Sequence, residues 1–135
     1  MFAGITDEAI FVADYQTIYM ASLRQPMKTR IRLPLKNLLR PIAIALDPFE
    51  NRIYWTDLTN GVVGRSSING KDQEIIHSGM VRPMGIALDL LAGNVYWVNN
   101  GNDTIEVSKL NGKYRKVLIS NLTSPYAIAL DTSRG

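Results

Sequence analysis

The chain has 135 residues, of which 46% are apolar and 20% charged, and its formal charge is only +3, so these values predict one small globular domain. The absence of cysteine excludes disulfide scaffolds, thiolate metal sites and cysteine nucleophiles. Because no run of about 18 apolar residues occurs, and the N-terminal "MFAGITDEAIFVADY" lacks a basic region followed by an apolar one, the sequence predicts neither a membrane-spanning helix nor a signal peptide.

The N-terminal segment, residues 8–39, is predicted to form a partial sheet of short strands. The strands are expected at "IFVAD" (10–14), "TIYMASL" (17–23) and "RIRLPL" (30–35). These stretches are rich in aromatic, β-branched or alternating apolar residues, which is typical of strands. No segment of the chain carries a sustained apolar stripe at helical spacing, so no helix is predicted.

Basic residues cluster within this segment and alternate with uncharged ones at Lys28, Arg30 and Arg32. Such a stripe can bind a polyanion. Alternation is also what a half-buried strand with one solvated face requires. We favour the solvated strand.

The rest of the chain repeats with a period of 42 residues. The octapeptides "RPIAIALD", "RPMGIALD" and "SPYAIALD" begin at Arg40, Arg82 and Ser124. Other landmarks keep the same register: Tyr54-Trp55 with Tyr96-Trp97, and Asn69-Gly70 with Asn111-Gly112. The repeat units therefore span 40–81 and 82–123, and 124–135 begins a further unit.

Each complete unit predicts four strands. They are expected at 42–47, 52–57, 62–68 and 73–77 in the first unit, and at 84–89, 94–99, 104–110 and 114–119 in the second. A period near 42 with four strands per unit is typical of a propeller blade, whose sheet buries its apolar faces against neighbouring sheets. The predicted fold is all-β: an incomplete propeller over residues 1–135, with about two complete blades and partial flanking blades.

The recurring Tyr-Trp pairs are predicted to fill the wedge between neighbouring blades, because large flat side chains suit that space. Thr56 and Asp57 follow the first pair, and we expect them to serve backbone donors that the blade junction leaves unpaired. The second unit has Val98 and Asn99 instead. The polar link should therefore differ there, although Asn99 can still accept a hydrogen bond.

The tetrapeptide "YWTD" at residues 54–57 resembles the signature of the low-density lipoprotein receptor class B repeat. The surrounding "GIALDLLAGNVYW" and "TIEVSKLNGKYRKVLI" are similar to the same family, and the similarity extends over residues 8–135. Among the low-density lipoprotein receptor-related proteins, these sequence motifs resemble the Wnt co-receptor branch most. The resemblance implies a propeller closed by six blades and followed by an EGF-like module, within the ectodomain of an endocytic or signalling receptor.

The resemblance also implies what the chain does. It implies non-catalytic recognition of extracellular protein ligands, at the extracellular face of the plasma membrane and as part of a larger receptor, in endocytosis or Wnt co-reception. It implies no enzyme activity, no metal and no cofactor. Two alternatives stay open: an extracellular-matrix propeller of the nidogen kind, and a propeller hydrolase or lactonase with an axial metal.

The chain ends at Gly135, inside the third copy of the repeat. Two complete and two partial units cannot close a ring of six blades. Because propellers depend on closure to hide their strand edges, we expect a fragment or a truncated gene product that is marginally stable or associates when isolated.

Catalytic candidates are few. His77 is the only histidine, and no paired base or nucleophile accompanies it, so we expect a structural or surface role. Asp47, Asp89 and Asp131 recur at the ends of the inner strands and would supply the axial metal of a lactonase. Because they recur in every unit and precede turn-like sequences, we favour a role in capping turns.

Binding is expected in the loops of one face, since rigid scaffolds place recognition in loops. These loops are 36–40, 58–61, 78–82, 99–103 and 120–124. Two sequons fall in this set, and they make Asn102 and Asn121 possible glycosylation sites if the chain is secreted. No phosphate-binding loop is present and the paired aromatics are core residues, so we expect no nucleic acid partner, and no membrane contact by this segment.

Overall fold

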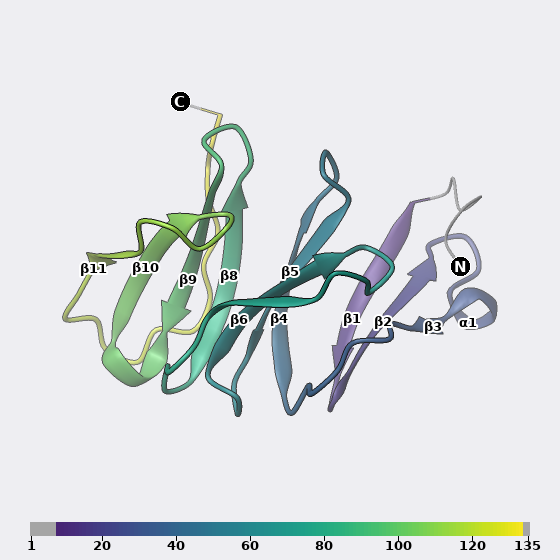
Figure 1. Cartoon of the computed structure of the whole chain (residues 1–135), viewed down its shortest axis with the longest axis horizontal. Helices are drawn as coiled ribbons and strands as arrows, with labels where there is room; N and C mark the ends of the chain where they lie inside the picture. Colours follow the sequence, from purple (N-terminus) through teal and green to yellow (C-terminus); the bar gives the residue numbers. More distant parts are fainter. Residues whose placement is uncertain (1–7, 134–135) are drawn as a thin grey trace.

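The computed structural model describes residues 8–133, and these form three antiparallel sheets that stand side by side like the blades of a fan (Figure 1). The first sheet consists of β1 (Ala9–Asp14), β2 (Thr17–Ser22) and β3 (Ile31–Arg32). The second consists of β4 (Pro41–Asp47), β5 (Arg52–Asp57), β6 (Val62–Ser67) and β7 (Glu74–His77). The third consists of β8 (Pro83–Asp89), β9 (Asn94–Asn99), β10 (Thr104–Lys109) and β11 (Lys116–Ile119). The prediction of all-β propeller blades is confirmed.

Strand order within each complete sheet follows the chain, with β4 and β8 at the inner edge and β7 and β11 at the outer edge. The inner strands hold the fan together, because β4 contacts both β1 and β8. The last hairpin of each complete sheet turns at Asn-Gly. Gly70 and Gly112 adopt φ values of +86° and +91°, which glycine reaches without a steric penalty.

Apolar side chains gather in two clusters, each between two neighbouring sheets. The cluster between the first and second sheets contains Ile18, Met20, Leu33, Ile53 and Trp55. The cluster between the second and third sheets contains Tyr54, Val63, Met80, Ile86, Val95 and Trp97. Because successive residues of a strand point to opposite faces, the adjacent Tyr54 and Trp55 wedge the second sheet against both of its neighbours.

Two short helices depart from the prediction of an entirely non-helical chain. Helix α1 (Pro26–Thr29) begins at a proline, whose fixed φ suits the first helical position. The Thr29 hydroxyl donates to the Gln25 carbonyl at 2.7 Å and accepts the Ser22 N–H at 2.8 Å, which ties this turn to β2. Helix η1 (Asn100–Asn102) is a single 3₁₀ turn in the loop after β9.

The basic stretch is consequently not one solvated strand. Lys28 lies in α1, and only Arg32 of the three basic residues lies in β3. The guanidinium of Arg30 lies over the ring of Tyr19, 5.1 Å from its centroid. The expected strand fails at its start because the helical turn that begins at Pro26 extends to Thr29 and includes Lys28.

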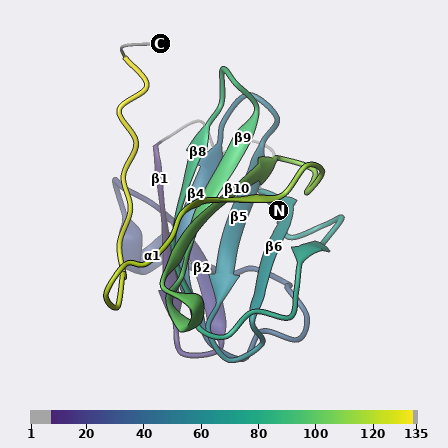
Figure 2. The ribbon, with the colours of Figure 1, turned by 90° about the vertical axis from the view of Figure 1, so that its left-hand side faces the viewer.

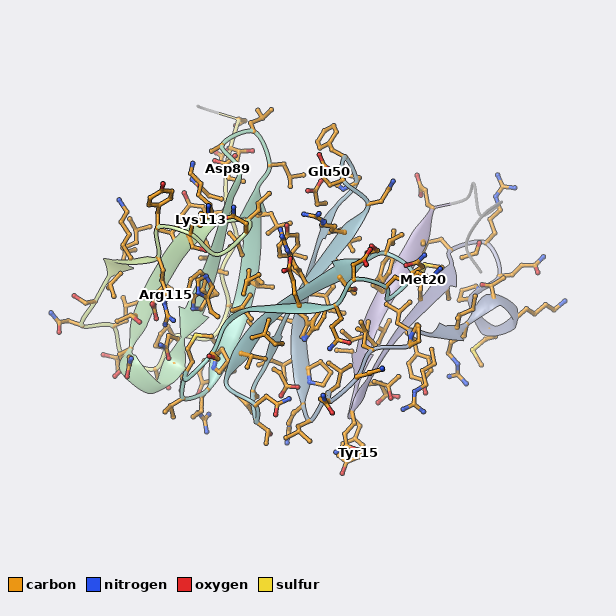
Figure 3. All side chains as sticks on the ribbon, viewed as in Figure 1. Tyr15, Met20, Glu50, Asp89, Lys113 and Arg115 are labelled. Carbon is orange, nitrogen blue, oxygen red and sulfur yellow. The ribbon has the colours of Figure 1, made fainter. Side chains whose placement is uncertain are left out.

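The sheets present two opposite rims. Glu50 and Asp89 lie at the upper rim in Figure 3, and Tyr15 lies at the lower one. Among residues 8–133, no helix has the length and apolar character that crossing a membrane requires.

Trp97→Ala should lower the free energy of unfolding by about 3–5 kcal/mol, because removal of a fully buried ring leaves a cavity between two sheets. Urea denaturation measures the loss. Tyr114→Ala removes another aromatic ring from an exposed turn and should change stability by less than about 0.5 kcal/mol. Equal losses for the two variants would contradict a wedge role for Trp97.

Candidate functional site

Five loops form a continuous rim along the lower edge of the sheets in Figure 1, and we call them the loop rim: residues 36–40, 58–61, 78–82, 99–103 and 120–124. Backbone hydrogen bonds join each loop to the next: Leu58 N to Arg40 O (2.9 Å), Met80 N to Gly61 O (3.1 Å), Gly101 N to Val81 O (2.8 Å) and Leu122 N to Asp103 O (3.1 Å). The loop rim is therefore one connected surface that rests on the ends of the strands.

Asp57 anchors the first part of the loop rim. Its carboxylate is fully buried and accepts the backbone N–H groups of Leu39 at 2.8 Å and Arg40 at 2.9 Å. It also accepts the N–H groups of Thr59 and Asn60 at 3.2 and 3.0 Å. One side chain thus satisfies backbone donors from two loops, which a buried charge requires.

Thr56 links the second sheet to the third, but as a donor. Its hydroxyl donates to the Met84 carbonyl of β8 at 2.5 Å, whereas the sequence suggested that it would serve a backbone donor. Val98 stands at the corresponding place in the third sheet and has no hydroxyl. There the Gly85 N–H donates directly to the Tyr126 carbonyl at 2.8 Å.

Gly85 permits this direct contact. A Cβ at this position would lie 2.9 Å from the Tyr126 carbonyl oxygen, too close for an unshifted backbone. The chain after Pro125 therefore runs against the inner strand of the third sheet.

Asn99 replaces Asp57 in the third sheet and is bonded differently. Its Nδ2 donates to Glu106 Oε2 at 2.8 Å, while its Oδ1 has no partner among the described residues. The polar link at this blade therefore differs from that of Asp57, as predicted, and the side chain of Asn99 donates a hydrogen bond although its amide oxygen could accept one. Burial alone would raise the pKa of Glu106, but hydrogen bonds from Arg115 and Asn99 lower that pKa below its usual range.

His77 lies in the interface between the second and third sheets, where it is 7% exposed. Its ring stacks on Trp97 with centroids 4.5 Å apart, and its Nε2 lies 2.8 Å from Ser108 Oγ. Burial, and next the positive charge of Arg115, lower the pKa of His77 to about 4, although Glu106 acts in the opposite direction. The neutral imidazole thus packs as a core side chain.

The carboxylates of the inner-strand ends cap turns. Asp47 Oδ1 accepts the N–H groups of Phe49 and Glu50 at 3.0 and 3.1 Å. Asp89 and Asp131 accept N–H groups in the corresponding turns, from Ala92 at 3.2 Å and Ser133 at 3.0 Å. Within the described residues, no group of three or more histidine, aspartate or glutamate side chains is arranged to hold a metal ion.

The two sequon loops contact each other on the loop rim. Asp103 accepts the N–H of Leu122 through its backbone carbonyl at 3.1 Å and the N–H of Ser124 through its carboxylate at 3.0 Å. Asn102 and Asn121 are both exposed. Glycosylation of either residue stays a prediction.

Several contacts beside the loop rim were not predicted from the sequence. Gln73 exchanges two 2.7 Å hydrogen bonds with the backbone of Lys36, and a shallow hollow of about 250 Å³ lies between these residues and Trp55. At the matching place in the third sheet, Arg115 pairs with Glu106 and lies over the Trp97 ring, 5.5 Å from the ring's centroid. The signal was present at the 42-residue offset, where Gly64 and Gln73 of the first copy correspond to Glu106 and Arg115.

A model of the low-density lipoprotein receptor repeat class B matches residues 51–90 and 93–132. The chain belongs to this family. The first class B repeat begins at β5 of the second sheet and ends just after β8, the inner strand of the third sheet, so one repeat of sequence bridges two sheets. The second repeat begins at β9 and ends in the extended segment after Pro125. Thr56 near the start of the first repeat donates to Met84 near its end, so one repeat supplies both partners of this hydrogen bond between sheets.

Solved structures support the same fold. A chain in the crystal structure of a nidogen/laminin complex has a TM-score of 0.87 and 29% identity to this class B repeat chain, over 96% of this chain and 51% of that one. An auxiliary nutrient binding protein from Bacteroides thetaiotaomicron has a TM-score of 0.72 and 10% identity, over 96% of this chain and 42% of that one. Hydrazine synthase from Kuenenia stuttgartiensis has a TM-score of 0.71 and 16% identity, over 88% of this chain and 34% of that one.

At these identities, the second and third likenesses show the fold alone. The class B repeat chain spans about half the length of the chain in the nidogen/laminin complex. No curated protein sequence matches it significantly.

Asp57→Ala should lower the free energy of unfolding by about 2–4 kcal/mol, because the N–H groups of Leu39 and Arg40 lose a buried, charged acceptor. Urea denaturation gives the loss, and amide exchange of residues 39 and 40 should accelerate beyond that of β5. Asp89→Ala removes a cap from a partly exposed turn and should cost less than about 1 kcal/mol. Unchanged exchange at residues 39 and 40 would contradict the anchoring role.

The stability of the chain should fall as the pH drops from about 6.5 to 4, in part because His77 stays neutral in the fold while the unfolded chain takes up a proton. His77→Leu should remove about 1–3 kcal/mol of this pH dependence. Leucine is a matched replacement, because Leu35 stands 42 residues earlier. Denaturation of both proteins across this range tests the prediction, and parallel stability curves would contradict it.

Proposed function

We propose that this chain is a non-catalytic recognition module that works outside the cell and binds a protein ligand through the loop rim. The observation that carries the proposal is the connected set of loops, held to one another by backbone hydrogen bonds on top of packed sheets. A surface of this kind is preorganised, so little conformational entropy is lost when a partner binds.

The composition of the loop rim suits a protein partner. Exposed amide and basic side chains dominate it, including Asn37, Arg40, Arg82, Asn102 and Asn121. Amides both donate and accept hydrogen bonds, and arginine is enriched at protein interfaces. We expect a ligand surface that offers carbonyl and carboxylate acceptors.

Two classes of extracellular protein are candidates for the whole protein. Membership in the class B family supports the ectodomain of a receptor related to the low-density lipoprotein receptor, with roles in endocytosis or Wnt co-reception. The likeness to a chain of a nidogen/laminin complex, at 29% identity over 96% of this chain, favours a matrix propeller as the second candidate.

We infer no enzyme activity. The support is that the side chains able to act as acids or bases already have structural roles. Asp47 and Asp89 cap turns, and His77 is buried against Trp97 and Ser108. Among residues 8–133, no group of three or more histidine, aspartate or glutamate side chains is arranged to hold a metal ion.

The ligand test uses two probes, purified laminin and a purified Wnt protein, on immobilised chain. Binding of laminin alone would support the matrix candidate, and binding of the Wnt protein alone the receptor candidate. Arg40→Glu, on the loop rim, should weaken the observed binding by about tenfold. Lys113→Glu makes the same charge change away from the loop rim (Figure 3) and should have less than about a twofold effect. Equal weakening by both variants would contradict the loop rim as the ligand site.

A further inference from the structure

The first sheet has an uncovered inner edge. In the second and third sheets an inner strand, β4 or β8, precedes the strand that carries the Tyr-Trp pair. The first sheet begins with β1, whose "IFVAD" aligns with "IYWTD" of β5, so β1 corresponds to the second strand of the other sheets. No described strand pairs with the other edge of β1. The backbone groups along that edge of β1 are therefore free to pair.

The chain also carries an inner strand that has no sheet. Residues 124–131, "SPYAIALD", repeat the sequences of β4 and β8. The structure extends them along β8 through the Gly85–Tyr126 hydrogen bond, and they pair with none of the described strands. Figure 2 shows this segment as an extended tube that is not drawn as a strand of any sheet.

One copy cannot join these two parts. The first sheet lies at one end of the fan and residues 124–131 lie beside the third sheet at the other end, with the second sheet between them (Figure 1). The inner strand without a sheet and the uncovered edge of β1 are complementary, and residues 8–133 of one copy do not bring them together.

We propose that two copies of this 135-residue chain pair head to tail, each adding residues 124–131 to β1 of the other. Each copy contributes three sheets, so the pair has the six blades of a closed propeller. The two contacts are identical by two-fold symmetry, which makes the assembly self-limiting. Closure leaves no inner strand edge unpaired.

The exposed faces at the two ends of the fan fit this arrangement. Ile10 and Val12 of β1 are 41% and 43% exposed, whereas their counterparts Ile53 and Trp55 in β5 are fully buried by the sheet before them. At the other end, Tyr96, Val107 and Leu118 line an open hollow of about 330 Å³ on the outer face of the third sheet. In the pair, Ile10 and Val12 of one copy would cover this hollow on the other.

The exposed area of the chain exceeds that of a compact monomer of the same mass. A compact monomer of this mass is expected to expose about 7,100 Å², and the chain exposes 8214 Å². The excess, about 1,100 Å², is larger than the area of 800 Å² or so that each partner buries in a standard stable interface.

The repeat also predicts the register of the new strand pair. Ile44 lies opposite Trp55 in the second sheet, and Ile86 lies opposite Trp97 in the third. At the 42-residue offset Ile128 corresponds to these isoleucines, and Val12 aligns with the tryptophans. Ile128 of one copy should therefore lie opposite Val12 of the other.

Light scattering coupled to gel filtration should give the 135-residue chain a mass of twice 15.1 kDa. Ile128→Asp should convert it to a folded monomer, because the carboxylate would face Val12 of the second copy. Leu91→Asp makes the same kind of change at an exposed turn outside the interface and should leave the mass doubled.

Cross-linking tests the register and needs no other substitution, because the chain has no cysteine. Val12→Cys and Ile128→Cys are prepared as separate chains, mixed and oxidised. They should form the mixed disulfide at least about tenfold faster than Val12→Cys with Leu91→Cys. A folded monomer for the unmodified chain, open-ended oligomers, or equal cross-linking of the two mixtures would each overturn the proposal.

Discussion

Each sheet of this protein can bury its apolar face only against the next sheet, and the rest of the structure depends on that constraint. Trp55 and Trp97 pack toward the preceding sheet, and Tyr54 packs toward the following one. The core is consequently divided into two clusters between sheets. An arrangement of this kind gains stability from each junction, and Ile10 and Val12, which face no other described sheet, are 41% and 43% exposed.

At the junctions between sheets, the backbone carbonyl groups accept hydrogen bonds from two different kinds of donor. Between the second and third sheets, the Thr56 hydroxyl donates to the Met84 carbonyl. Beyond the third sheet, where valine replaces the threonine, the backbone of Gly85 approaches the Tyr126 carbonyl directly. Buried carbonyl groups require a donor, and glycine makes the second solution possible because it has no Cβ in the way. The class B sequence therefore tolerates the loss of its threonine.

The loop rim owes its rigidity to these junctions. Asp57 ties two loops together from beneath, and the remaining loops follow through backbone hydrogen bonds. In the proposed function, the ligand contacts exposed side chains of the loop rim, such as Arg40, and we expect substitutions there to change binding without disturbing the sheets. The carboxylates and the histidine that suggested catalysis are, in contrast, committed to turns and to the core.

The 42-residue period by itself determined the blade architecture, the strands and the structural role of the Tyr-Trp pairs, because a repeated unit must bury the same face in the same way each time. It did not predict α1, because this helical turn lies before the repeat units, between the strands expected at 17–23 and 30–35. Only the tertiary structure decided which side chains meet across the junctions, such as His77 with Trp97 and Ser108. These contacts join different sheets, and their partners depend on how the sheets pack, which local propensity and periodicity do not specify.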